Sequence, residues 1–147
     1  YEPLIHIPLI IAYPNQQKRE DIYQPTSAID LLPTLLELSG ASIPNNMPGI
    51  SLIPRNGSSL PERDLFVVEA KSNSSFGPLR KGTFSIIHGN DKLIYYTGYE
   101  GFNEVYELYN LQDDPEETHD LSTIHKVRKD ELVRILKQEI NQNQSPI

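Results

Sequence analysis

One apolar helix decides the fold, and it is predicted over Thr26-Ser27-Ala28-Ile29-Asp30-Leu31-Leu32-Pro33-Thr34-Leu35-Leu36-Glu37-Leu38-Ser39-Gly40. Ser27, followed three residues later by Asp30, can cap the first turn, and Gly40 supplies a left-handed stop. Apolar side chains at positions 28, 29, 31, 32, 35, 36 and 38 cover most of the helix circumference. We therefore expect this helix to be buried on more than one side and to need a large partner.

The composition limits the classes of partner. The chain has 147 residues, a net charge of −7, 12 prolines and no cysteine. Nucleic acids and anionic membranes both need a basic surface, so neither is expected as the main partner. The lack of cysteine excludes disulfides and thiolate chemistry within these residues and leaves the redox compartment open. Because Tyr1 begins without a methionine or a leader, we interpret the chain as a piece of a longer protein.

The first 60 residues are typical of the end of an α/β domain. Residues 4–14 form a nearly continuous apolar run rich in β-branched residues, which predicts a strand covered on both faces. A polar loop then leads to the helix at 26–40, giving the strand-loop-helix order of α/β architecture. Residues 41–64 carry prolines and glycines without a period, and we place a domain boundary near residue 60.

Residues 61–147 predict a small antiparallel sheet packed against a C-terminal helix. Strands are expected at 64–70, 84–88, 92–96 and 104–111, with a hairpin turn at 89–91. A final helix is expected from Ile124, with its apolar face formed by Ile124, Val127, Leu132, Ile135, Leu136 and Ile140. The fold class is therefore α+β: a terminal strand-helix piece of a larger α/β domain at 1–60, and a C-terminal subdomain at 61–147.

No active site is assembled from these residues alone. His6 is expected to be a hydrogen-bonded core or edge histidine, and His119 and His125 are six residues apart, unlike the i, i+4 spacing of a helical zinc pair. The acidic residues of 113–117 are explained by a solvated turn. The Ser/Asn/Gly loop at 71–78 is followed by Arg80 and Lys81, and loops between strands are where ligand contacts concentrate.

Three stretches, in this order, resemble the C-terminal part of the sulfatase family of the alkaline-phosphatase-like superfamily. The first is Tyr1-Glu2 with Ile7-Pro8-Leu9-Ile10-Ile11 and Tyr13-Pro14, and the second is Ile29-Asp30-Leu31-Leu32-Pro33-Thr34-Leu35-Leu36 with Gly49-Ile50-Ser51-Leu52. The third is Glu107-Leu108-Tyr109-Asn110-Leu111 with Asp114-Pro115-Glu116-Glu117 and Asp120-Leu121. Residues 80–86 also look like the family's Arg-x-Gly-x-Tyr-Lys-Ile strand, but Phe84-Ser85 replaces its Tyr-Lys.

The resemblance implies a parent enzyme that hydrolyses sulfate esters with calcium and a formylglycine nucleophile. In the family the nucleophile motif and the metal ligands precede the Tyr-Glu pair, so no catalytic or metal-binding residue is assigned in this chain. The implied partners are the α/β domain that precedes Tyr1 and a sulfate-ester substrate. Family subdomains of this kind help to wall the substrate cleft, so residues 71–80, with Lys71 and Arg80, are the expected substrate contacts.

Two alternatives stay open at this point. The parent enzyme can be a phosphate or phosphonate ester hydrolase or a phosphoglycerol transferase of the same superfamily, whose C-terminal parts look alike. The chain can also be a non-enzymatic interaction module, because the strand expected at 4–12 needs cover on both faces. The second alternative includes self-association through residues 4–12.

Overall fold

The structure is a computed structural model that describes residues 1–13, 16–53, 60–71 and 79–143. It contains two compact units, one formed by Tyr1–Leu9 with Phe66–Ile147 and the other by Ile10–Leu65. Within the described ranges no helix combines the length and the apolar character needed to cross a membrane.

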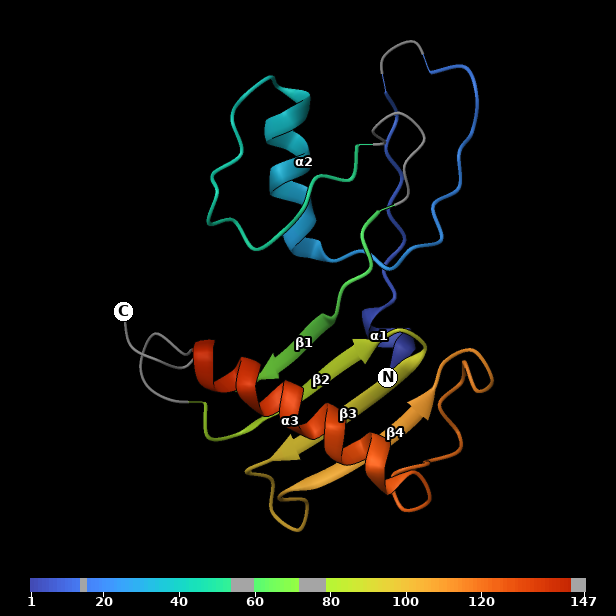
Figure 1. Cartoon of the computed structure of the whole chain (residues 1–147), viewed down its shortest axis with the longest axis vertical. Coiled ribbons are helices and arrows are strands. Elements are labelled where there is room, and N and C mark those ends of the chain that lie inside the picture. The colour runs from blue at the N-terminus through green and yellow to red at the C-terminus, as the bar shows by residue number, and fades with distance from the viewer. Residues whose placement is uncertain (14–15, 54–59, 72–78, 144–147) are drawn as a thin grey trace. The chain divides into compact units, whose positions relative to one another are not determined.

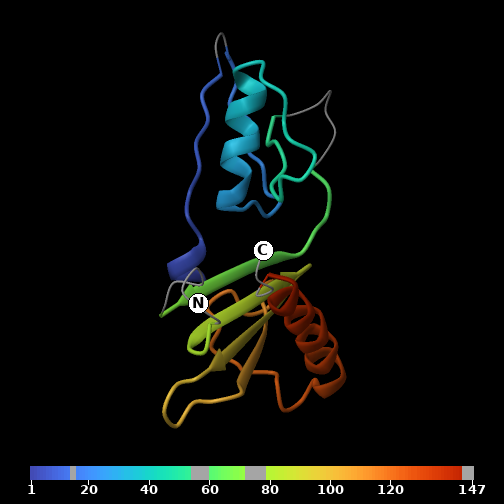
Figure 2. The same cartoon turned by 90° about the vertical axis from the view of Figure 1, so that its left-hand side faces the viewer.

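The first unit is a four-stranded sheet with a helix on each face. Its strands are β1 (Leu65–Ala70), β2 (Gly82–His88), β3 (Asp91–Thr97) and β4 (Val105–Asn110), and they lie in the order β1-β2-β3-β4 (Figure 1). β3 pairs antiparallel with β2 and with β4. Figure 2 shows α3 (Lys126–Asn143) on one side of this sheet and the short helix α1 (Glu2–Ile5) on the other.

The alternation of side chains along the strands separates an apolar face from a polar one. The face toward α3 carries the core, in which Ile86 of β2, Leu93 of β3 and Leu132 of α3 are fully buried. The remaining members of this core are Phe84, Tyr95, Leu108 and Leu136. Lys92, Ile94 and Tyr96 of β3 alternate with these residues and therefore lie on the opposite face, toward α1.

The expected hairpin and the expected third strand are confirmed. His88 of β2 pairs with Asp91 of β3, and Gly89 turns the chain with a φ of +61°. A positive φ is a conformation that glycine adopts without a steric penalty, which is why a glycine serves this two-residue connection. The last helix is also confirmed, but Ile124 precedes it, and Ile124 and Val127 are 73% and 87% exposed rather than part of its buried face.

The strand expected at 4–12 is wrong for this structure. Residues 2–5 are helical, and residues 6–13 have neither helix nor strand. A strand covered on both faces needs neighbouring strands to pair with, and the described residues supply none for this run. Leu4, Ile7 and Ile10 are accordingly 79%, 76% and 93% exposed.

The second unit contains the helix predicted at 26–40. A single 3₁₀ turn (Ala28–Asp30) leads into α2 (Leu31–Leu38), and Gly40 follows with a φ of +74°, as the stop signal predicted. The expected burial on several sides is not found, because Leu32 and Leu35 are 55% and 61% exposed. The apolar surface of α2 is thus uncovered within the described residues.

Asp30 organises this unit although it carries a charge. Its side chain is fully buried and accepts hydrogen bonds from the amides of Ser27 (2.8 Å) and Ile50 (2.9 Å). Arg63 adds a two-pronged ion pair, in which Nη1 lies 2.9 Å from Oδ1 and Nη2 contacts Oδ2. Burial alone would raise the pKa of Asp30, but these hydrogen bonds and the Arg63 charge hold the pKa below its ordinary value.

Two further contacts bind the segment at 49–52 to the helix. The Thr34 hydroxyl donates to the Asp30 carbonyl (2.6 Å) and accepts from the Leu52 amide (3.0 Å). Gly49 lies so close to the helix start that a Cβ at this position would be 2.1 Å from the Ile29 carbonyl oxygen. Only glycine permits this approach, which brings the Ile50 amide to Asp30.

Removing side-chain volume from the first unit's core is expected to destabilise it strongly. Leu132→Ala should lower the free energy of unfolding by about 2 to 5 kcal/mol, because it leaves a cavity at a fully buried site. Val127→Ala, on the exposed side of the same helix, should change it by less than about 0.5 kcal/mol. Urea unfolding monitored by circular dichroism measures both, and equal effects would contradict the assigned core.

Neutralising Asp30 is expected to make the second unit less stable in a pH-dependent way. Asp30→Asn leaves Arg63 without its counter-charge and should cost about 3 to 5 kcal/mol at pH 7. Because the pKa of Asp30 is lowered on folding, the stabilisation is present above about pH 4, the ordinary value for aspartate, and is lost as the pH falls below it. The difference between the wild type and the variant should therefore shrink in acid.

Asp21→Asn is the matched control for this change. Asp21 also pairs with an arginine, Arg19, at 2.8 Å, but the two side chains are 45% and 85% exposed. Such a pair contributes at most about 1 kcal/mol. Thermal unfolding between pH 3 and pH 7 compares the two variants, and a pH-independent cost of Asp30→Asn would refute the role given to its charge.

Candidate functional site

A buried lysine, Lys92, lies on the inner strand β3, on the face of the sheet opposite the apolar core. The Lys92 side chain is 1% exposed, and its Nζ lies 2.9 Å from Oε1 of Glu2 and 2.8 Å from Oε1 of Glu117. A buried ammonium group is costly unless it is paired, and here two carboxylates pair with it. These three residues were missed by the sequence reasoning. The available signal was the position of Lys92, which shares its strand face with Ile94 and Tyr96.

One of these carboxylates, that of Glu117, comes from the turn after β4. The Asp114 carboxylate accepts hydrogen bonds from the amides of Thr118 (2.9 Å) and His119 (2.9 Å), which also lower the pKa of Asp114. Glu117 lies inside this turn with a φ of +54°, a region that residues with a Cβ rarely adopt. The prediction of a solvated acidic turn fits Asp113 and Glu116, which are exposed, but is wrong for Glu117, which is 6% exposed.

Tyrosine side chains surround another carboxylate, that of Glu107, on the same face of the sheet. Oη of Tyr1 and Oη of Tyr96 each lie 3.0 Å from Oε2 of Glu107, and the rings of Tyr1 and Tyr109 are 6.2 Å apart. Burial, together with the Tyr1 hydroxyl and the neighbouring Glu107, raises the pKa of Tyr96 far above its ordinary value. The Tyr96 phenol therefore stays protonated and donates its hydrogen bond to Glu107, and with the Tyr1 contact this group can hold the first residues in place.

Lys71 and Arg80, the expected substrate contacts, lie near each other at one edge of the sheet. Lys71 follows β1 directly, and its amide donates to the Lys81 carbonyl across the β1–β2 pair at 3.3 Å. Its side chain pairs with Glu69, which raises the pKa of Lys71. Arg80 is exposed just before β2. Residues 72–78 of the predicted contact loop lie outside the described residues.

The β3–β4 connection meets the same edge. Gly98, at a φ of +75°, lies so close to the chain that a Cβ would be 2.0 Å from the Arg80 carbonyl oxygen. Tyr99 follows, with its hydroxyl 3.2 Å from Oγ1 of Thr83 and its ring 5.0 Å from Nζ of Lys81. The edge thus presents three cations and one aromatic ring, a combination suited to an anionic ligand with an apolar ring face.

The histidines do not form a metal centre. In the described part of the chain no three His, Cys, Asp or Glu side chains are placed to hold a metal ion. His6, expected as a core or edge histidine, has a 79% exposed side chain, and its Nδ1 lies 3.8 Å from Oε2 of Glu2. The Nδ1 atom of His119 lies 2.7 Å from the Thr118 hydroxyl. The described residues thus offer no metal site of this kind.

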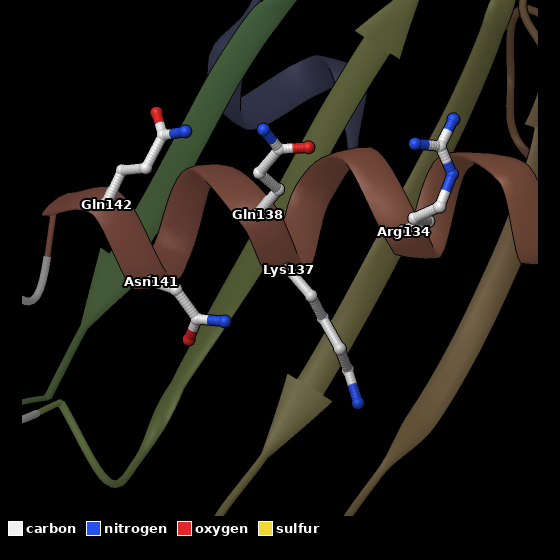
Figure 3. Close-up of a pocket in the computed structure, with 5 residues that line it drawn as sticks. All are labelled: Arg134, Lys137, Gln138, Asn141 and Gln142. Carbon is white, nitrogen blue, oxygen red and sulfur yellow. The ribbon is translucent and has the colours of Figure 1, made fainter.

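A hollow of about 620 Å³ lies on α3, and its polar side chains do not converge on one point (Figure 3). Its lining residues are Arg134, Lys137, Gln138, Asn141 and Gln142. Figure 3 shows that these side chains point in different directions from the helix. Lys137 is engaged elsewhere, because its Nζ lies 3.2 Å from Glu104 and 5.3 Å from the ring of Tyr95.

Comparisons with known proteins relate the chain to sulfatases. The model of the family described as N-sulphoglucosamine sulphohydrolase, C-terminal, matches residues 1–146. Arylsulfatase K of Xenopus laevis is 30% identical over 134 residues, which cover 80% of this chain and 22% of that protein. The chain thus spans about a quarter or less of the length of the relatives and structures compared here.

Solved structures share the fold. The structure of BT1596, described as a 2-O GAG sulfatase, is 26% identical with a TM-score of 0.54, and the match covers 79% of this chain and 25% of that one. The phosphonate monoester hydrolase of Agrobacterium radiobacter is 16% identical with a TM-score of 0.53, covering 84% and 26%. At that identity the second likeness shows the fold alone. The family match extends over nearly the whole chain, and the chain therefore belongs to the N-sulphoglucosamine sulphohydrolase C-terminal family of the sulfatases.

Proposed function

We propose that the whole protein is a sulfate-ester hydrolase, to which this chain contributes scaffold and part of the wall of the substrate cleft. The observation that carries this proposal is the family match over residues 1–146. The two clusters built from motif residues, around Asp30 and around Lys92, hold segments together, which is the chemistry of a scaffold. The calcium and the formylglycine that the resemblance implies would lie on residues outside this chain.

The α/β domain of the whole enzyme is the proposed partner for the uncovered apolar surfaces. Leu32, Leu35 and Leu38 of α2 are 55%, 61% and 44% exposed, and contiguous apolar surface of this kind marks an interaction site. The domain division near residue 60 is part of this proposal. Self-association through residues 4–12 is the competing proposal, and light scattering of the full-length enzyme tests it, because a monomer rules it out for the intact protein.

Full-length enzyme is expected to hydrolyse 4-nitrophenyl sulfate in preference to 4-nitrophenyl phosphate and to phenyl phosphonate esters. The 147-residue chain alone should hydrolyse none of them, because no catalytic residue of the family is assigned to it. Release of 4-nitrophenol or phenol measures all three rates. A preference for the phosphorus esters would replace the sulfatase proposal with the phosphoryl or phosphonate alternative, and turnover by the isolated chain would contradict the scaffold role.

Lys71 and Arg80 are proposed to bind an anionic group of the substrate. The family name and the BT1596 description both refer to sulfated sugars, so N-sulphoglucosamine and its oligosaccharides are the probes of choice. Lys71→Met and Arg80→Met should each raise KM several-fold, about 1 kcal/mol of lost charge-assisted binding, with a smaller change in kcat. Lys126→Met, an exposed lysine at the start of α3, is the control. Unchanged KM in both edge variants would remove this edge from the cleft wall.

A further inference from the structure

We propose that Lys92 is a positioning residue of the whole enzyme, which holds Tyr1 and Glu2 on the C-terminal sheet. The proposal rests on the proposed function, in which the catalytic residues precede Tyr1. Tyr1 and Glu2 are next in sequence to the proposed catalytic domain. By fixing these two residues, Lys92 sets the position at which the catalytic domain is joined to the C-terminal sheet.

The contacts of Lys92 join distant parts of the sequence. Lys92 is the second residue of β3, and it pairs with Ile87 of β2 and with Tyr109 of β4. From the middle of the sheet its Nζ reaches Glu2, 90 positions earlier, and Glu117 in the turn after β4. The Glu2 amide also donates to the Glu117 carboxylate. Glu2 is thus held through both its backbone and its side chain.

Tyr1 provides a second anchor beside the first. Its hydroxyl lies 3.0 Å from Oε2 of Glu107, the carboxylate oxygen that Tyr96 also contacts at 3.0 Å. Its ring lies 6.2 Å from that of Tyr109. The hold is confined to these first residues, since Leu4 and Ile7 are 79% and 76% exposed. The arrangement is therefore a local fastening of Tyr1 and Glu2 and not the docking of a long segment.

The charges make the fastening depend on Lys92. The side chains of Lys92 and Glu117 are 1% and 0% exposed, and that of Glu2 is 22% exposed. Without the ammonium group two carboxylates would face each other in a poorly solvated space, and their repulsion would push the mobile partner away. Glu117 is fixed in its turn, so Glu2 and its helix α1 are the parts that would leave. A buried ionic cluster of this kind specifies one arrangement more than it adds stability.

The test uses full-length enzyme and hydrogen exchange at the N-terminal side of this unit. In Lys92→Met the amides of Leu4 and His6, which bond to Tyr1 and Glu2 within α1, should exchange about tenfold faster or more, while those of β4 stay protected. In the same variant kcat for 4-nitrophenyl sulfate should fall about 10- to 100-fold, with little change in KM, because the catalytic groups are displaced.

Two further variants separate positioning from a general loss of stability. Lys92→Arg keeps the charge and should restore most of kcat and of the protection in α1. The triple variant Glu2→Gln, Lys92→Met, Glu117→Gln removes the repulsion and should also recover much of the protection. Lys126→Met, an exposed lysine of the same unit, should behave as the wild type.

The outcomes are distinct. Unchanged exchange at Leu4 and His6 in Lys92→Met, or equally faster exchange in β2, β3 and β4, would overturn the proposal. Faster exchange confined to α1 with unchanged kcat would also overturn it, because Lys92 would then hold α1 without positioning the catalytic part. If the wild type hydrolyses no sulfate ester, the sulfatase proposal fails by itself, and the exchange result still decides whether Lys92 fastens Tyr1 and Glu2.

Discussion

A charge that leaves water must find an opposite charge and hydrogen bonds inside the protein, and this constraint shapes both units. In the second unit the Asp30 carboxylate is fully buried and brings together the start of α2, the Ile50 amide and Arg63. In the first unit the Lys92 ammonium group is buried and brings together Glu2 and Glu117. Each charge joins segments that are distant in the sequence.

Local signals predicted the elements whose stability is local. The glycine turn at 89–90 and the alternation of β4 predicted the hairpin and the third paired strand, because each of these strands pairs with the strand next to it in the sequence. The stop at Gly40 likewise follows from its own backbone conformation. The apolar run at 4–12 failed as a strand, since a strand exists only with pairing partners, and none lies within the described residues.

The buried charges could not be predicted in the same way. The acidic residues of 113–117 look alike in the sequence, yet Asp114 serves the turn and Glu117 is buried against Lys92. Glu117 differs from Asp114 in its left-handed backbone conformation, and no glycine in this turn indicates that conformation in the sequence. Lys71 and Arg80 were predicted from the resemblance, and they lie near each other because a loop between two paired strands begins and ends at the same edge of the sheet. The fold brings the ammonium group of Lys81 and the ring of Tyr99 to the same edge, and the sequence alone did not predict this.

The same constraint explains how a chain without assigned catalytic residues can carry a family's sequence pattern. The Tyr-Glu pair and the Asp-Pro-x-Glu stretch meet at Lys92, while Asp30, Thr34 and Gly49 join the helix to the segment that follows it. Each of these residues satisfies a buried group or permits a close approach, and most substitutions would leave a charge or a backbone amide without a partner. These requirements limit which residues each position accepts, because burial penalises each unmatched polar group separately. These requirements explain the family motifs of this chain. The motif residues pair buried charges or allow close backbone contacts, and they specify how this part of the protein is held together. The motifs lie at 1–2, 29–36, 49–52 and 107–117.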